Sequence, residues 1–302
     1  MTNNRIVVAG SSGLLGSALT SALEARGDTV VRLIRTNPRP GSSGLAAWDP
    51  ASGDLDPAVL AGADAVIVLN GVPIGDKRWN DGRKALILSS RLDAVGTVAR
   101  TMAAMHSPPS VLMSASAIGF YGERGNDLLT EAEPAGEGFF ADVCDRWEAA
   151  ADPARAAGIR VVTPRTGLVL SGDGGALKPM VPLFKLGIGG RIGDGQQWWS
   201  WIAEHDWVRG MLHCLDGDIN GPVNLVAPNP VTNEAFTKAL GATLHRPTFL
   251  PVPKLGITLR LGRELADAVG YVSHRVDPTV LRATGFEFEY PTVTDALTAA
   301  LG

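Results

Sequence analysis

The residues with the clearest capacity for chemistry form a glycine-rich turn near the N-terminus. Gly10, Gly13 and Gly16 lie three residues apart in AGSSGLLGSAL, between an apolar run and an amphipathic stretch. In a turn from a strand to a helix, such glycines permit the turn itself, close approach of a pyrophosphate, and tight helix packing. Amides at the start of the helix then bind the anion. A tight turn without a ligand is the alternative, but the order of strand, turn and helix favours binding.

The residues expected to contact a dinucleotide through this turn are Gly10, Ser11, Ser12, Gly13, Leu14, Leu15 and Gly16. The end of the following apolar run distinguishes the two common dinucleotides, because an acidic residue there binds a ribose hydroxyl whereas arginine accommodates a 2′-phosphate. Arg35 occupies that end, and no Asp or Glu lies between Thr29 and Asp49. We therefore expect NADP(H), with NAD(H) less favoured. A solvated charge at the end of a strand is the alternative interpretation of Arg35.

Apolar runs without polar alternation must position this turn. We expect strands over Arg5–Ala9, Thr29–Ile34, Ala65–Leu69, Ser110–Met113 and Ile159–Thr163. Runs of this kind are typical of parallel strands that are covered on both faces. Amphipathic stretches between them, such as Leu14–Arg26, predict covering helices. The fold class is therefore α/β, a doubly wound Rossmann sheet.

The composition changes after Leu170, where Gly, Pro and Trp become frequent. We expect a Rossmann domain over residues 1–170, to which some later segments return, and a loop-rich substrate lobe over 171–302. Helices are predicted over Asn233–Leu240, Thr258–Ala268 and Thr292–Leu301. Trp198, Trp199, Trp201 and Trp207 could form the wall of a substrate pocket, but core packing is the better interpretation for at least two of them.

Composition and charge narrow the classes of function. The 302 residues are 45% hydrophobic and 19% charged, which is ordinary for a globular enzyme, and their formal net charge of −4 disfavours nucleic acid as a partner. The two cysteines and the absence of metal-ligand spacings predict neither a disulfide framework nor a metal site. Without a signal or membrane-spanning pattern, we expect no membrane partner and a cytoplasmic location.

Taken together, the motifs resemble the extended short-chain dehydrogenase/reductase superfamily, and within it the atypical "epimerase family" subgroup related to NAD-dependent epimerases and dehydratases. The motifs that carry the resemblance are AGSSGLLG, VLNGVPIGDKRW, SASAIGFYG, PRTGLVLSGDGGAL and VDPTVLRATGFEFEYPTVTDAL. They cover nearly the whole chain in order. The last of them resembles the small C-terminal domain of the subgroup, at about residues 250–302.

This resemblance implies further cofactor contacts at the ends of later strands. They are Leu69, Asn70 and Gly71 on the adenosine side, Ser114 near the nicotinamide, and Gly167 and Leu168 at the carboxamide. Arg91, on a helix that flanks the sheet, is a further candidate, with a surface salt bridge as the alternative.

The catalytic pattern departs from the family. Classical members use a Ser and a Tyr-x-x-x-Lys helix, in which the lysine lowers the pKa of a phenol that moves the proton while hydride is transferred. Ser116 matches the serine, but Phe140 and Cys144 stand where the tyrosine and the lysine are expected, in a register set by Glu148. Phenylalanine has no proton to transfer. Tyr121 is the nearest replacement in sequence, with aromatic packing as the alternative.

Two functions follow from this pattern. The first is an NADP(H)-dependent oxidoreductase or epimerase-like enzyme that acts on a small molecule with an unusual proton donor, with catalysis expected at Ser116 and Tyr121. The second is a protein that binds NADP(H) as a sensor without catalysis. A homodimer is a possible assembly for either.

Overall fold

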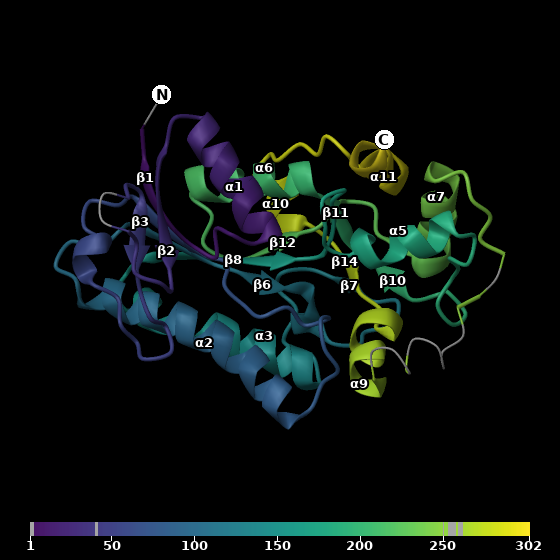
Figure 1. Ribbon diagram of the computed structural model, residues 1–302, viewed down its shortest axis with the longest axis horizontal. Helices are drawn as coiled ribbons and strands as arrows, with labels where there is room; N and C mark the ends of the chain where they lie inside the picture. The colour runs from purple at the N-terminus through teal and green to yellow at the C-terminus, as the bar shows by residue number, and fades with distance from the viewer. Residues whose placement is uncertain (1–2, 40–41, 250, 253–257, 259–261) are drawn as a thin grey trace.

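A computed structural model describes all residues except 1–2, 40–41, 250, 253–257 and 259–261 (Figure 1). Its described part contains one eight-stranded sheet in which every pairing is parallel. In spatial order the strands are β12 (Gly221–Leu225), β8 (Arg160–Thr166), β5 (Val111–Ser114), β4 (Ala65–Val68), β1 (Arg5–Ala9), β2 (Thr29–Ile34) and β3 (Leu45–Ala47), with β6 (Ser116–Ala117) beside β8. The order reverses at β1, which is the point where such sheets bind ligands.

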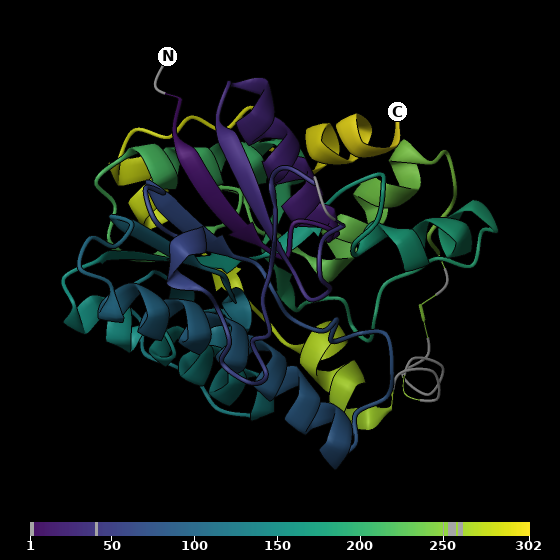
Figure 2. The ribbon, with the colours of Figure 1, turned by 60° about the vertical axis from the view of Figure 1, so that its left-hand side comes forward.

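Helices cover both faces of this sheet, as Figures 1 and 2 show. One face carries α1 (Leu14–Ala25) and α6 (Glu204–Asp216), and the other carries α2 (Asp81–Ala104), α3 (Phe139–Ala149) and α4 (Asp152–Ala156). Residues of the central strand β1 alternate between the two cores. Ile6 packs with Leu19 of α1, whereas Val7 packs with Val98 of α2. The continuous apolar runs of the sequence therefore arise from strands buried on both faces.

A smaller lobe lies beside the carboxyl ends of the strands. Its core contains Trp201 and Phe236, packed by α5 (Leu177–Lys185), α7 (Asn233–Thr243) and α11 (Val293–Leu301). The remaining elements of the described chain are all short. They are β7 (Leu128–Leu129), β9 (Leu168–Leu170), β10 (Trp198–Trp199), β11 (Trp201–Ala203), β13 (Val231–Thr232), β14 (Arg275–Val276), η1 (Pro57–Val59), η2 (Ile118–Tyr121), α9 (Arg263–Ala266), η3 (Asp267–Tyr271) and α10 (Thr279–Ala283).

The α/β doubly wound class is confirmed, and the five expected strands are present, two of them, β1 and β2, with the predicted ends and three with shifted ends. The largest shift is in β8, which was expected to end before Pro164 and instead continues through Thr166. Proline is tolerated there because it falls between the last β5 pair, Met113 with Val162, and the first β6 pair, Ser116 with Arg165.

Helix ends also differ from the predictions. The helix expected over Leu14–Arg26 ends at Ala25, and the one expected over Asn233–Leu240 runs on to Thr243. Part of the predicted 258–268 helix lies outside the described residues, and its described part contains α9. No helix in the described chain is both long and apolar enough to cross a bilayer.

Candidate dinucleotide site

The glycine turn lies at the carboxyl end of β1 and leads directly into α1. Gly10 has φ of +86°, and a Cβ atom there would lie 2.9 Å from the backbone carbon of Leu69. A Cβ atom at Gly16 would lie only 2.1 Å from the carbonyl oxygen of Gly10. These two positions therefore require glycine for the turn itself. Gly13 is different, because it is the exposed N-cap of α1 in an extended conformation that any residue adopts.

The other residues predicted around this turn lie close by. Ser11 is half-buried, Ser12 is exposed, and Leu15 packs against the core beneath α1. Cβ atoms at Gly174 or Gly175 would lie 3.3 Å from the side chain of Leu14. A loop of the smaller lobe therefore borders the first turn of α1, so the turn lies where the two lobes meet.

Arg35 follows β2 directly and is exposed. No ion pair or hydrogen bond engages its side chain within the described part of the chain. Arg32, three residues earlier, is instead bound to Glu24 of α1 at 2.6 Å. Arg35 is thus available to an anionic ligand, whereas Arg32 is already engaged.

Several buried polar atoms at this edge lack hydrogen-bond partners within the described chain, and three of them belong to residues predicted to contact the dinucleotide. These three are Oδ1 of Asn70, Oγ of Ser114 and Nε of Arg91. Asn70 lies just beyond the carboxyl end of β4, the neighbour of β1, and Ser114 is the last residue of β5, the next strand along. Buried polar atoms are nearly always paired, so these atoms fit a site that is completed by a polar ligand. The residues present are therefore compatible with a bound dinucleotide.

Gly167 and Leu168 connect β8 to the smaller lobe. A Cβ atom at Gly167 would lie 2.7 Å from the carbonyl oxygen of Ser200, and Leu168 pairs with Trp201 in the parallel pair β9 and β11. The glycine allows two backbones to approach closely at the end of β8. Trp201 and Trp207 are both buried, which confirms core packing for two of the four clustered tryptophans.

Ser116, the predicted catalytic serine, lies in β6 and is nearly buried. Its Oγ donates a hydrogen bond of 2.7 Å to Oε1 of Glu148 on α3. Glu148 in turn forms a two-point ion pair with Arg165 of β8, at 2.9 Å from Nε to Oε1 and 3.0 Å from Nη2 to Oε2. Because an arginine only donates and an ionised carboxylate only accepts, the serine proton points toward Glu148. The lone pairs of Ser116 Oγ are left for a ligand.

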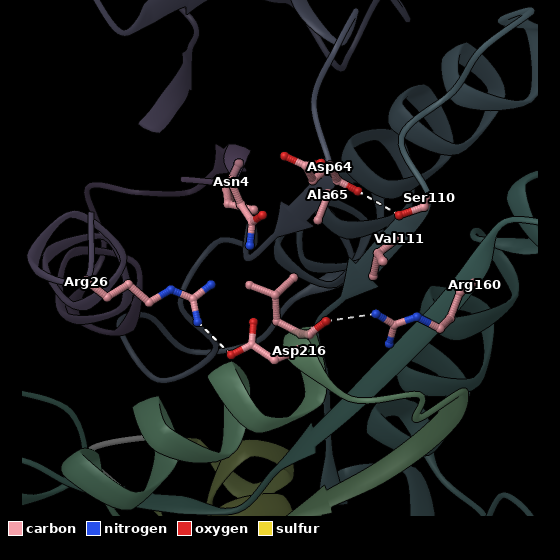
Figure 3. Close-up of a pocket in the computed structure, with 10 residues that line it drawn as sticks. Asn4, Arg26, Asp64, Ala65, Ser110, Val111, Arg160 and Asp216 are labelled. Atoms are coloured by element: carbon pink, nitrogen blue, oxygen red, sulfur yellow. Dashed lines mark hydrogen bonds and ion pairs between the residues drawn. The ribbon is translucent and has the colours of Figure 1, made fainter. Parts of the chain in front are cut away.

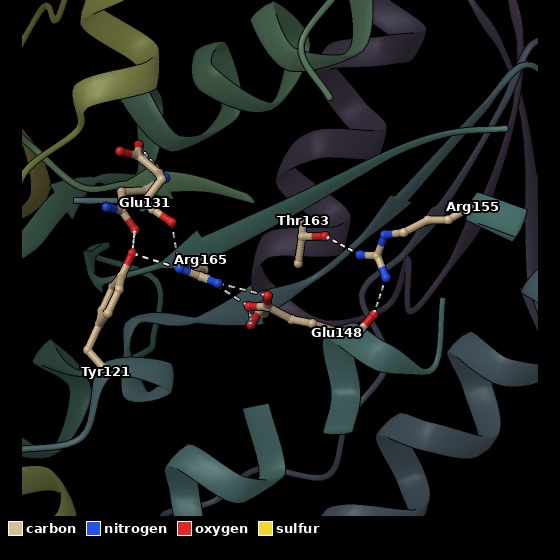
Figure 4. A network of polar contacts seen from close by, with 8 residues as sticks. Tyr121, Glu131, Glu148, Arg155, Thr163 and Arg165 are labelled. Atoms are coloured by element: carbon tan, nitrogen blue, oxygen red, sulfur yellow. Dashed lines mark hydrogen bonds and ion pairs between the residues drawn. The ribbon is translucent and has the colours of Figure 1, made fainter. Parts of the chain in front are cut away.

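Tyr121 belongs to the same network, which Figure 4 shows, but its hydroxyl is already occupied. The hydroxyl accepts from Nη1 of Arg165 at 3.0 Å and donates to Oδ1 of Asn224 at 2.7 Å. The side chain is fully buried, and this burial raises the pKa of Tyr121 to about 12. To give a proton to a ligand, Tyr121 would first have to break its bond to Asn224. The contacts therefore favour a structural role that supports Arg165.

Phe140 and Cys144 lie on α3 beside this network. The ring of Phe140 packs against the turn after Ser116, since a Cβ atom at Gly119 would lie 2.2 Å from its Cδ1. Cys144 is fully buried, and this burial raises the pKa of its thiol to about 12. A neutral buried thiol neither attacks a substrate nor supplies a positive charge.

A cavity of about 540 Å³ opens at the opposite, amino edge of the sheet (Figure 3). The charged groups that line it are already paired. Arg26 is bound to Asp28 and Asp216, and Arg160 donates to the carbonyl oxygens of Cys214, Leu215 and Ile219. Arg160 therefore caps the end of α6. We place the functional site at the carboxyl edge instead.

Sequence reasoning missed the part that Arg165 plays and used Glu148 to set the register of the helix. Both residues act through a contact between segments that are distant in sequence. The one sequence feature that could have drawn attention to Arg165 is its charge inside a buried apolar strand. Among the described residues, no cluster of three or more His, Cys, Asp or Glu side chains could hold a metal ion.

The fold and the site define a Rossmann protein with a dinucleotide-type glycine turn and a second lobe over its carboxyl edge. A sequence profile of the NAD dependent epimerase/dehydratase family matches residues 6–225, and a profile described as a domain of unknown function, DUF1731, matches residues 252–300. The chain therefore belongs to the NAD dependent epimerase/dehydratase family, within the atypical epimerase-family group that the motifs indicated.

Known relatives resemble the chain over its full length. It is 41% identical to the epimerase family protein Mb2239 of Mycobacterium bovis, covering 98% of this chain and 97% of that protein. The crystal structure of human epimerase family protein SDR39U1 (isoform 2) with NADPH has a TM-score of 0.88 and 31% identity, covering 98% and 99% of the two chains. A nucleoside-diphosphate sugar epimerase from Corynebacterium glutamicum has a TM-score of 0.79 and 36% identity, covering all of this chain and 59% of the other.

Proposed function

We propose that this protein is an NADPH-binding oxidoreductase or epimerase-like enzyme acting on a small polar alcohol or carbonyl compound between its two lobes. The observation that carries the proposal is the turn of Gly10 to Gly16. It packs closely at the carboxyl end of β1 and leads into α1, so the first amides of α1 are available to a phosphate at this edge of the sheet. The human relative crystallised with NADPH supports the choice of cofactor. Asn70, Ser114 and Arg35 would hold the dinucleotide together with this turn.

When bound, a nicotinamide supplies or accepts hydride. The chain must transfer the proton that accompanies the hydride, and we propose that Ser116 transfers this proton. Its Oγ accepts the proton of a substrate hydroxyl while its own proton moves to Oε1 of Glu148, along the 2.7 Å bond. Reduction of a carbonyl reverses both transfers. Arg165 keeps the carboxylate oriented, so Ser116 and Glu148 replace the missing tyrosine.

The cofactor is tested by titrating the protein with NADPH and NADH while nicotinamide fluorescence and tryptophan quenching are followed. We expect tight binding of NADPH and weaker binding of NADH. An Arg35→Ala variant is expected to raise the Kd for NADPH about tenfold and to leave NADH unchanged, because only the 2′-phosphate loses a partner. Arg32→Ala is the matched control, since Glu24 already engages that arginine. Equal binding of both cofactors by the wild type would remove Arg35 from the site.

Catalysis is tested by following nicotinamide absorbance with a broad panel of small carbonyl and alcohol compounds. We expect saturable turnover, which Ser116→Ala lowers by about 100-fold or more while NADPH affinity stays unchanged. Tyr121→Phe keeps the packing of the ring and separates the two candidate donors. If Tyr121→Phe loses turnover and Ser116→Ala does not, the proton passes through Tyr121 instead.

A second candidate function is a sensor that binds NADPH without chemistry. Phe140 and Cys144 favour it, because neither side chain moves a proton at neutral pH. The sensor predicts tight NADPH binding and no substrate-dependent change in absorbance. It fails as soon as one compound of the panel is converted with saturation. For the enzyme, we further propose a small-molecule substrate, a cytoplasmic location and assembly as a homodimer.

A further inference from the structure

His274 is a buried histidine whose Nε2 atom has no hydrogen-bond partner in the described part of the chain. The residue directly precedes β14 and is 8% exposed. Burial lowers the pKa of the imidazole to about 4, so the ring is neutral at pH 7 and carries a single N–H group. The neutral ring therefore offers one donor nitrogen and one acceptor nitrogen.

The bond between this ring and the backbone of Gly122 identifies the donor nitrogen. The N–H of Gly122 already donates to the carbonyl oxygen of Gly119 at 3.2 Å. The bond to His274 raises the pKa of the imidazole, as a bond from the ring to a carbonyl oxygen does, so the carbonyl oxygen of Gly122 is the acceptor. Because Nε2 has no partner, the donor is Nδ1, and Nε2 presents an unpaired lone pair.

The backbone of His274 is also held, so the free nitrogen does not come from a loosely placed side chain. The N–H of His274 donates to the carbonyl oxygen of Trp198 at 2.9 Å, and its carbonyl oxygen accepts from Oγ of Ser200 at 2.8 Å. The same Oγ accepts from the N–H of Val276 at 2.8 Å. Buried acceptors are nearly always paired, so Nε2 fits a site that a ligand with a donor group completes.

His274 connects two segments of the candidate site. Its ring bonds to Gly122, at the end of the turn that begins with Ser116 in β6. Its backbone bonds to Ser200, whose carbonyl oxygen accepts from the N–H of Leu168, the first residue of β9, at 2.9 Å. Figure 1 shows β14 where the sheet meets the smaller lobe. The imidazole therefore borders the region between the lobes in which the proposed substrate binds.

The strand that follows His274 packs against the turn that it contacts. Val276 belongs to one buried cluster with Tyr121 and Cys144. Side chains alternate along a strand, so His274 lies on the same side of this segment as Val276. Its bond to Gly122, the residue after Tyr121, agrees with this direction. The imidazole therefore faces the turn rather than the solvent.

Two hydrogen-bond acceptors thus border this region. Because the proton of Ser116 points toward Glu148, the Oγ of Ser116 offers its lone pairs to the reacting hydroxyl. Nε2 of His274 offers a lone pair to a different donor. A substrate with a single hydroxyl would leave Nε2 buried and unpaired, and a site built to bond a hydroxyl rejects an analogue that lacks it.

We propose that Nε2 of His274 accepts a hydrogen bond from a second hydroxyl group of the substrate, which is therefore a hydroxylated carbonyl compound or a polyol. This role depends on the enzyme function proposed above and specifies its substrate class. Ser116 would engage the reacting group, and His274 would distinguish compounds by the second hydroxyl.

The test uses two pairs of probes that differ by one hydroxyl, hydroxyacetone with acetone and glyceraldehyde with propanal. Oxidation of NADPH gives kcat/KM for each probe, and the readout is the ratio of the hydroxylated probe to its partner. We expect His274→Asn to lower this ratio about tenfold, because asparagine keeps a donor for Gly122 but has no acceptor at the Nε2 position. The intrinsic reactivity of the probes is the same for every variant and cancels in the comparison with the wild type.

Two control variants separate recognition from folding. His274→Gln places an acceptor near the Nε2 position but loses the bond to Gly122, so it should keep most of the ratio while its melting temperature falls. His213→Asn replaces a histidine whose Nε2 is already bonded to Oγ1 of Thr284 at 2.8 Å, and it should leave the ratio unchanged. If His274→Asn does not fold, loss of the ratio in folded His274→Gln would still overturn the proposed role.

An unchanged ratio in folded His274→Asn would mean that Nε2 does not meet the substrate, and the role of His274 would be wrong although the enzyme function would stand. Conversion by the wild type of only those compounds that lack a second hydroxyl would have the same meaning. If the wild type converts no probe and no compound of the wider panel, the proposed enzyme function itself fails.

Discussion

Replacing Gly13 with aspartate is expected to raise the Kd for NADPH at least about 100-fold without unfolding the protein. Gly13 is the N-cap of α1 with φ of −76° and ψ of 168°, so an L-residue is allowed there, and a Cβ atom would have only an ordinary contact of 3.6 Å with the Gly10 carbonyl oxygen. Aspartate is also a favourable N-cap residue. Its carboxylate would occupy the helix amides and repel the pyrophosphate.

The measurement is a fluorescence titration with NADPH, paired with thermal unfolding of the same sample. Gly13→Asn is the matched control, because asparagine has the same size and capping ability without the charge. We expect its affinity to lie within about tenfold of the wild type. Undiminished NADPH binding by Gly13→Asp would show that the phosphates do not lie on the α1 amides. An equal loss in both variants would point to steric exclusion rather than charge.

The second large effect is expected from unpairing Glu148 and Arg165. Their side chains are 12% and 4% exposed, so either single truncation leaves an uncompensated charge in a nearly dry environment. We expect Glu148→Ala and Arg165→Met each to lower the free energy of unfolding by about 3 to 5 kcal/mol. Arg165 also stacks over Phe120, with its Cζ 3.5 Å from the ring centroid, and holds the Tyr121 hydroxyl, so its loss disturbs a wider region.

The interaction free energy of this pair is measured by a double-mutant cycle. Urea unfolding is followed for both single variants and for the double variant Glu148→Leu/Arg165→Met. The double variant should lose much less than the sum of the two single variants, because it leaves neither charge unpaired. Asp142→Ala is the control, since its ion pair with Arg146 on the same helix spans 3.6 Å between exposed side chains and should contribute less than about 1 kcal/mol. Additive losses in the double variant would contradict the buried-pair account.

The sequence by itself determined the local parts of this protein. A strand, a glycine turn and a helix follow one another within the first 25 residues, and their conformation depends on neighbours a few positions away. Gly10 and Gly16 therefore stand out without a structure, and so does Arg35 at the end of the next strand. The buried parallel sheet could be predicted for the same reason, because its strands carry continuous apolar runs that local pattern reveals.

Only the tertiary structure decided which side chains surround the predicted catalytic residues and where the charges lie. Ser116 meets Glu148 from 32 residues away, and Tyr121 meets Asn224 from 103 residues away. Such contacts depend on β6, β8 and β12 lying side by side, an order set by crossovers and core packing rather than by local preference. The same holds for Arg91, which sequence could place on a helix but not against Gly71 and over the ring of Trp147.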